Sequence, residues 1–460
     1  MPYSVAAMRT ASFRRLPSSP TVVRAASPAR DPRTAVPRGR RDVLALFCFD
    51  WDEMGYARLA DRWRVLRAGF DLFTFPSNLR LIAFDLERFV EKLAIRYGDR
   101  GLSGVTSANE QFGALAAALL AQRLGLPGTS PESIIRCQHK LGMRELLSRV
   151  APEANLPCFA LDCEYGQSPP DDLHYPLFVK PIKAAFSVLA RRVENREELA
   201  RLTRFGPLEA WIIRRLVAPF NAIAQRRVGF PVDAHHMICE TPVCAPQFNL
   251  DGYVYRGQAR ILGVVDALMY PGTRAFLRFA YPSRLPAAVR QRAFDVARRF
   301  LKAAQFTHGL FNMEFFYDAA TDELKVIEFN PRLASQLADL YRRVDGVDVH
   351  AISLALACGD DPALEPRLQP LGTAAASFVF RSFDMQAPPE PDAAQRRWLR
   401  DNHPDAILLT FPKRARARAR DLKWLESHRH AVLHLHGDDE ADLRARYERV
   451  CTEFGWPAVY

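Results

Sequence analysis

Hydrophobic and polar positions follow a strand-like pattern in some stretches of the chain and helical spacing in others. The apolar run DVLALFCFDW (42–51) predicts a buried strand. The stretch 101–128 predicts a second short strand and then an Ala/Leu-rich helix from about Asn109 to Arg123, which glycine and proline end. Strand, helix and glycine-rich exit in this order are typical of a βαβ unit, so we expect a βαβ-type domain at residues 42–128.

The middle of the chain alternates between strand and helix patterns. Residues 130–150 predict one helix, with Ser130 as its N-cap and Pro131 in its first turn. The elements that follow are a strand at 175–182, its hairpin partner at 187–193, a short helix at 196–202, helix within 207–236, a strand in 235–243, a hairpin at 247–268, a helix at 286–306 and a second hairpin at 309–330.

The second hairpin carries buried-looking carboxylates. In its last strand, Val326 and Glu328 share one side by simple alternation, and Asn330 lies on that side two residues on. If the hairpin is symmetric about residue 321, Glu314 lies directly opposite Glu328. Like charges at paired positions destabilise a sheet, and burying a carboxylate is costly without compensation.

A divalent cation between the two carboxylates would reverse the sign of this effect. Carboxylate oxygens and the amide oxygen of Asn330 are ligands that suit Mg²⁺. The alternative is a surface hairpin with two solvated glutamates. Large apolar neighbours disfavour that alternative: Met313, Phe315, Phe316, Ile327 and Phe329.

Charge is unevenly distributed along the chain of 460 residues. Residues 1–41 hold nine arginines and one acid, which accounts for +8 of the net charge of +11. The remaining chain is therefore close to neutral, which argues against a nucleic-acid-binding protein. No stretch approaches the roughly 18 apolar residues of a membrane span.

The Arg-, Ser- and Pro-rich segment 1–41 predicts a disordered tail. A transit peptide has a similar composition, but we favour the alternative that the tail has no targeting role. Deleting residues 1–40 is expected to leave the melting temperature and the ligand affinity of the chain nearly unchanged. A loss of several degrees, or of soluble protein, would show instead that the tail packs on the body.

Three further features are best interpreted without any binding or catalytic site. The eight cysteines form no C-x-x-C pair, which favours free thiols in a reducing cytoplasm. The basic run 413–423 predicts a solvated edge strand or loop rather than a phosphate site. The HLH triplet at 434–436 predicts ordinary packing, because no third metal ligand is near.

The segment VIEFNPR (326–332) resembles the magnesium-binding end of the ATP-grasp superfamily, and other motifs follow in that family's order. The likeness covers about residues 42–360. It implies an α/β (α+β) fold in which a Rossmann-like pre-ATP-grasp domain at 42–128 precedes a two-subdomain ATP-grasp domain at 129–360. The lid subdomain is then expected at about 152–245, and residues 361–460 form a C-terminal extension.

The resemblance also implies roles for individual residues. Lys140 and Lys180 match the two lysines that bind nucleotide phosphates, and ICETPVCAPQ (238–247) resembles the hinge that lies against adenine. The residues implied as metal ligands are Glu314, Glu328 and Asn330; those implied to contact the nucleotide are Lys140, Lys180, Ser187, Glu240, Val243 and Gln247; Arg332 is the arginine at the transferred phosphate.

Two departures from the family pattern affect nucleotide affinity more than fold. The lid loop, KPIKAAFS (180–187), lacks the usual glycines. Either Lys183 and Ser187 compensate, or main-chain N–H groups contribute less to phosphate binding. The hinge ends in Gln247 where the family usually has a glutamate for the ribose hydroxyls, and an amide oxygen accepts these protons more weakly.

The resemblance implies an ATP-dependent ligase that activates a carboxylate as an acyl phosphate and couples it to an amine, releasing ADP and phosphate. A biotin-carboxylase-like enzyme and a non-catalytic ATP-binding sensor are the alternatives. Mg²⁺ is the expected metal, with Mn²⁺ as a substitute. The expected partners are a small-molecule acid and an amine, and neither nucleic acid nor a membrane. We expect a cytoplasmic protein, and a homodimer is one open alternative for its oligomeric state. Arg274, Arg278 and Arg284 are candidates for a substrate carboxylate and equally for surface charges.

Overall fold

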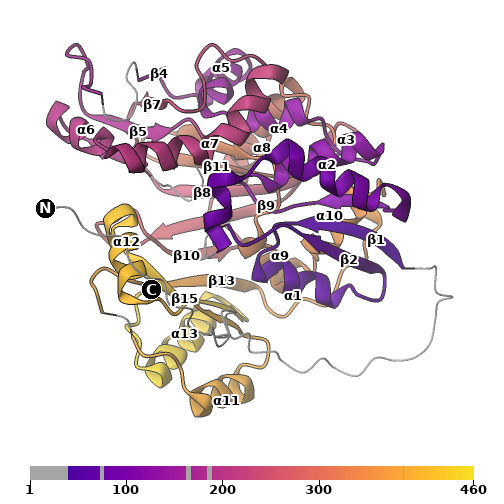
Figure 1. Cartoon of the computed structure of the whole chain (residues 1–460). Helices are drawn as coiled ribbons and strands as arrows, with labels where there is room; N and C mark the ends of the chain where they lie inside the picture. Colours follow the sequence, from indigo (N-terminus) through magenta and orange to yellow (C-terminus); the bar gives the residue numbers. More distant parts are fainter. Residues whose placement is uncertain (1–39, 73–76, 162–166, 184–188, 387) are drawn as a thin grey trace, which may run out of the picture.

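The computed structural model describes residues 40–72, 77–161, 167–183, 189–386 and 388–460. Three sheets form its frame (Figure 1): a three-stranded sheet near the N-terminus, a four-stranded sheet in the lid, and a central sheet of eight strands. The expected mixed α/β fold is confirmed. Residues 1–39 lie outside the described ranges, and so does nearly all of the tail to which the deletion prediction refers.

The N-terminal domain is built on parallel strands in the order β2-β1-β3. Strand β1 is buried because Val43, Leu44, Ala45 and Leu46 are each fully covered. The elements of this domain are β1 (Arg41–Leu46), α1 (Asp50–Arg58), β2 (Trp63–Ala68), α2 (Leu86–Tyr97), β3 (Gly104–Thr106) and α3 (Gly113–Leu124).

The segment predicted to be the lid, called the lid below, forms a small antiparallel sheet in the order β4-β7-β5-β6, with two helices beside it. Its apolar core is its own, formed by residues such as Val179, Leu199 and Cys239. The lid elements are β4 (Cys158–Ala160), β5 (Leu177–Pro181), β6 (Arg191–Val193), α6 (Arg196–Thr203), α7 (Pro207–Arg227) and β7 (Met237–Glu240), and two helices, α4 (Pro131–Gln138) and α5 (Lys140–Val150), precede it.

The central sheet has the strand order β12-β11-β8-β9-β10-β13-β15-β14. Its first strands and covering helices are β8 (Gln247–Tyr255), β9 (Gln258–Met269), β10 (Phe276–Tyr281), α8 (Ala287–Ala303), β11 (Gly309–Asp318), β12 (Glu323–Asn330), α9 (Ser335–Asp345) and α10 (Val349–Ala357). Helix α8 covers the hairpin β11–β12, where Phe300 stacks on Phe329 at 3.8 Å between ring centroids.

Residues after 360 complete this same sheet rather than standing apart from it. Strand β13 pairs with β10 on one side and β15 on the other. The C-terminal elements are β13 (Ala374–Ser382), α11 (Ala393–Asn402), β14 (Ile407–Thr410), α12 (Ala415–Leu425), β15 (His428–Gly437) and α13 (Glu440–Phe454). The domain boundaries expected at residues 128 and 360 stay predictions.

The prediction that β12 alternates simply was wrong. The ladder with β11 pairs Asp318 with Glu323 but Glu314 with Glu328, so that a one-residue bulge at Ile327 shifts the register. Val326 and Phe329 therefore both face the core beneath α8, and Glu328 points to the opposite face with Asn330. The expected pairing of the two glutamates is present all the same.

Two other local predictions were wrong. Residues 130–150 form two helices, because His139 has an extended backbone (φ −83°, ψ 98°) and its side chain caps α5 by accepting the N–H of Gly142. The basic run at 413–423 lies mostly in helix α12 instead of an edge strand or loop. Alternating Ala and Arg are both strong helix formers, and no β-branched residue interrupts them.

Helix α12 reaches the lid, and Figure 1 shows it beneath α6 and α7. Lys423 of α12 pairs with Glu209 of α7 at 3.1 Å, and Glu426 just after α12 pairs with Arg191 of β6. Within the described ranges, none of the helices is both long and apolar enough to cross a membrane. The seven cysteines in those ranges form no disulfide, and Cys163 lies outside them.

Candidate active site

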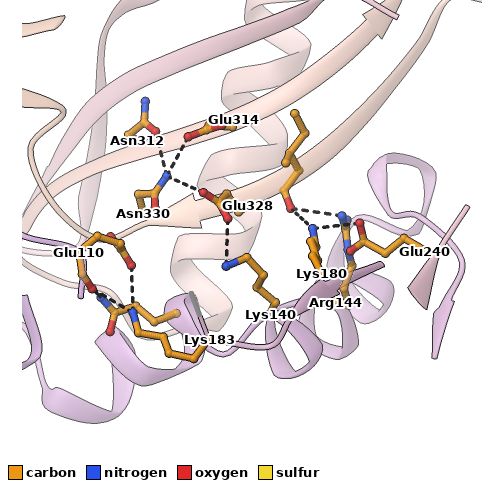
Figure 2. Close-up of polar contacts among 12 residues, drawn as sticks. Glu110, Lys140, Arg144, Lys180, Lys183, Glu240, Asn312, Glu314, Glu328 and Asn330 are labelled. Atoms are coloured by element: carbon orange, nitrogen blue, oxygen red, sulfur yellow. Dashed lines mark hydrogen bonds and ion pairs between the residues drawn. The ribbon is translucent and has the colours of Figure 1, made fainter. Parts of the chain in front are cut away.

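The carboxylates of β11 and β12 lie on the face of the central sheet away from α8. Figure 2 shows Asn330 between them: its Nδ2 donates to Oε1 of Glu314 at 3.3 Å and to Oε1 of Glu328 at 3.5 Å. Gln247 at the start of β8 donates its Nε2 to the other oxygen of Glu314 at 2.8 Å. The structure thus brings together all three predicted metal ligands. Gln247, which was predicted to contact the ribose hydroxyls, lies beside them.

The two carboxylates have opposite electrostatic surroundings. Burial, and then the neighbouring charge of Glu328, raise the pKa of Glu314. Burial also acts to raise the pKa of Glu328, but the ammonium groups of Lys140 and Lys180 outweigh it and lower that pKa. Lys140 lies 3.3 Å from Glu328 as an ion pair. Without a cation, the negative charge is therefore unfavourable mainly at Glu314.

This donor set fits a magnesium ion. Two carboxylates and one amide supply hard oxygens, and the amide orientation that now donates to both glutamates is interchangeable with the one that presents oxygen. Within the described ranges no group of three His, Cys, Asp or Glu side chains could hold a metal, so Asn330 is needed as the third ligand.

The second predicted lysine lies in a buried ion-pair network at the lid base (Figure 2). Lys180 Nζ is 2.9 Å from one oxygen of Glu240, and Arg144 Nε is 2.8 Å from the other. The same two cations donate to main-chain oxygens of β12: Arg144 to Val326 and Ile327, Lys180 to Ile327. Because β12 is an edge strand, these contacts cover carbonyl groups that no further strand pairs.

Burial lowers the pKa of Lys180, and Glu240 partly offsets this shift. Burial acts to raise the pKa of Glu240, but Lys180 and Arg144 outweigh it and lower that pKa. The side chain of Glu240 therefore links β7 to Lys180. The predicted adenine contact of the hinge concerns main-chain groups and stays a prediction.

Sequence reasoning missed one carboxylate, Glu110, in the loop after β3. It lies 3.2 Å from Arg332 Nε and 3.5 Å from Lys183 Nζ. Lys183 is 2 % exposed, and burial lowers its pKa to about 8 against the opposing effect of Glu110. One signal in the sequence could have identified Glu110: the polar residues Asn109 to Gln111 directly follow a buried strand.

Five other candidates remain to be placed. Lys183 contacts Glu110 and so does not stand free as a substitute for the missing lid glycines. Val243 lies in the connection between β7 and β8, and Ser187 lies outside the described residues. Arg278 and Arg284 both pair with Glu440 at the start of α13, at 3.5 and 2.9 Å, which makes them anchors for that helix.

A cavity of about 90 Å³ lies beside Arg332, between the N-terminal domain and the start of β11. Alanines of α3 and polar groups of Thr106, Ser353 and His308 contribute to its wall. This cavity provides space next to the predicted transfer arginine. Its other lining residues come from β3, α4, α10 and the segment after β12.

Comparisons with known proteins agree with the fold. No family model matches the chain. It is 29 % identical over 174 residues to the D-alanine–D-alanine ligase of Deinococcus radiodurans, covering 38 % of this chain and 46 % of the relative. It is 28 % identical over 278 residues to carnosine synthase 1 of Gallus gallus, covering 55 % of this chain and 27 % of the relative. The chain thus spans about half or less of these curated relatives.

Solved structures match over most of the chain. The L-amino acid ligase from Bacillus licheniformis has a TM-score of 0.66 at 16 % identity, covering 90 % of this chain and 98 % of that one. N5-carboxyaminoimidazole ribonucleotide synthetase from Thermus thermophilus has a TM-score of 0.60 at 15 % identity, covering 91 % and 100 %. These neighbours are ATP-grasp enzymes. With its sheet order and its clustered acidic hairpin, the chain shares the fold of these ATP-grasp enzymes.

Proposed function

We propose that the chain is an ATP-dependent ligase that joins a carboxylate to an amine. One observation supports this most: Glu314, Glu328 and Asn330 converge on one face, with Lys140 paired to Glu328 and Arg332 two residues beyond Asn330. Phosphoryl transfer depends on such charge placement more than on a protein nucleophile.

In this proposal, the substrate carboxylate attacks the γ-phosphorus of ATP and the bond to the β-phosphate oxygen breaks, giving an acyl phosphate and ADP. The amine then attacks the acyl carbon, phosphate leaves with the C–O electrons, and the amine proton passes to solvent. Lys140 and Lys180 bind phosphate oxygens, and the guanidinium of Arg332 binds the transferred group through paired donors.

Glu314, Glu328 and Asn330 would hold Mg²⁺ in this site. The ion would supply positive charge against the phosphate oxygens. Gln247, now bonded to Glu314 at 2.8 Å, lies close enough to the metal ligands to orient one of them instead of a ribose hydroxyl. The names of the relatives point to amino acids or short peptides as substrates, since they include amino acid ligases and a carnosine synthase.

The test is an ADP-release screen with ATP and Mg²⁺ over pairs of amino acids and dipeptides, followed by mass spectrometry of the products. We expect ADP release that requires both an acid and an amine, with a product mass equal to their sum less one water. ADP release that requires bicarbonate and a biotinyl acceptor would support the biotin-carboxylase-like alternative. ATP binding without turnover under every condition would support a sensor.

A further inference from the structure

Glu110 occupies a place where three parts of the chain meet. It belongs to the loop between β3 and α3, whereas Arg332 follows β12 and Lys183 follows the lid strand β5. One carboxylate oxygen lies 3.2 Å from Arg332 Nε and the other 3.5 Å from Lys183 Nζ. Figure 2 shows Glu110 and Lys183 to one side of the acidic pair Glu314 and Glu328.

The main chain of Glu110 is held firmly. Its carbonyl oxygen accepts from Lys183 Nζ at 2.9 Å and from Gln138 Nε2 at 2.9 Å. Just before it in the chain, the side chain of Asn109 accepts the N–H groups of Phe112 and Gly113. A Cβ at Gly113 would lie 2.1 Å from Ser107 Oγ, so the turn requires glycine there. The loop therefore presents the Glu110 carboxylate from a fixed backbone.

The way Glu110 contacts Arg332 matters for the chemistry. Glu110 Oε2 lies 3.2 Å from Nε as an ion pair without the geometry of a hydrogen bond, and Nη1 donates to the Leu333 carbonyl at 3.4 Å. A guanidinium that is paired with a carboxylate at Nε can still direct its terminal N–H groups at an oxyanion. An arginine side chain left unfixed would lose side-chain entropy in each catalytic cycle to reach the same geometry.

We propose that Glu110 is a positioning residue for the transfer step, one that holds Arg332 in place and pairs with the buried Lys183. This inference rests on the proposed ligase function. Lys183 has a structural part in it: the ammonium is buried, lies 5.1 Å from the ring centroid of Phe220, and has Glu110 as its carboxylate partner. Glu110 thus connects the N-terminal domain with both the strand that carries the metal ligands and the base of the lid.

The experiment compares Glu110→Gln, Lys183→Met and the double variant in the full chain. Glu110→Gln is expected to lower the maximal rate of ADP formation by about 10- to 100-fold, because a small displacement of Arg332 is enough for such a loss. Its ATP affinity should stay within about threefold of the parent. Its melting temperature should fall, because Lys183 then lies buried without a carboxylate.

Lys183→Met should lower the rate of ADP formation less than Glu110→Gln does, because Gln138 still holds the Glu110 carbonyl and the carboxylate remains beside Arg332. The double variant should recover the melting temperature, since the unpaired ammonium is gone, yet keep the low rate of Glu110→Gln. Glu132→Gln is the matched control, because Glu132 also pairs across elements, with Arg227 of α7 at 2.6 Å, but away from Arg332. This control should retain the parent rate.

Three results would overturn the inference. They are a parent-like rate in Glu110→Gln, a double variant that recovers its rate together with its melting temperature, and a loss confined to the apparent affinity for the amine, which would place Glu110 on the substrate. The melting temperatures test the Glu110–Lys183 contact without any substrate. If the parent chain shows no ligase turnover, the proposed function fails while that contact is still measured.

Discussion

Arg332→Ala is expected to bind Mg²⁺–ATP almost normally and to form ADP on the order of 10²-fold more slowly than the parent, or slower still. A preorganised charge at a transition state has an effect of this size when it is removed. The side chain lies beside Glu110 and the adjacent cavity, so the change leaves Glu314, Glu328 and Asn330 in place. Calorimetry of nucleotide binding beside an ADP-release assay measures both quantities.

Glu328→Gln is the companion variant and should fail in a different way. It removes the negative charge that pairs with Lys140 at 3.3 Å and that would hold the metal, so apparent Mg²⁺ affinity and turnover should fall together. Glu314→Gln should raise the stability of the metal-free chain, because burial and Glu328 already raise the pKa of Glu314. Full activity in both Arg332→Ala and Glu328→Gln would show that these groups are structural and that the ligase proposal is wrong.

Replacing Lys140 is expected to weaken ATP binding by about 10- to 100-fold, since a charge-assisted hydrogen bond contributes roughly 1.5–3 kcal/mol. Adenosine binding should change little, because adenosine has no phosphate for Lys140 to contact. The ammonium of Lys140 pairs with Glu328, and methionine keeps the apolar part of the side chain, so Lys140→Met should leave the melting temperature close to that of the parent. Isothermal calorimetry with ATP, ADP and adenosine separates these effects.

Lys180 should behave differently in the same assay, because it lies buried against Glu240. Lys180→Met should weaken ATP binding to a similar degree and also lower the melting temperature. Adding Glu240→Gln should lower the melting temperature further, because Arg144 then lies buried without its carboxylate partner, and it should not recover ATP affinity. An equal loss of ATP and adenosine binding in Lys140→Met would mean that Lys140 supports the fold rather than the phosphates.

The acidic hairpin was predictable because the interactions that define it are local. Even so, the pairing of Glu314 with Glu328 came out correctly through two errors that cancel. The turn is centred half a residue earlier than assumed, and the bulge at Ile327 restores the register. Alternation alone placed Glu328 on the core side with Val326, because a bulge leaves no mark in a hydrophobic pattern.

Glu110 and the break at His139 could not be derived in the same way. The partners of Glu110 are distant in sequence, at Lys183 and Arg332, and no periodic pattern links such positions. His139 has helical neighbours on both sides, and its extended backbone comes with a tertiary contact, a ring stack on Phe230 at 3.8 Å. Tertiary packing overrides local propensity at such positions.

The order in which the central sheet is completed has a consequence for synthesis of the chain. Strand β10 pairs with β9 on one side, but its other neighbour, β13, follows only after roughly 90 further residues. At ribosomal rates of about 5–20 residues per second, that edge stays open for about 5–20 s. The strand FLRFAY is apolar at most positions, and an open apolar edge invites pairing with other chains. Nascent chains that have completed β10 but not β13 are therefore expected to be prone to pairing with other chains.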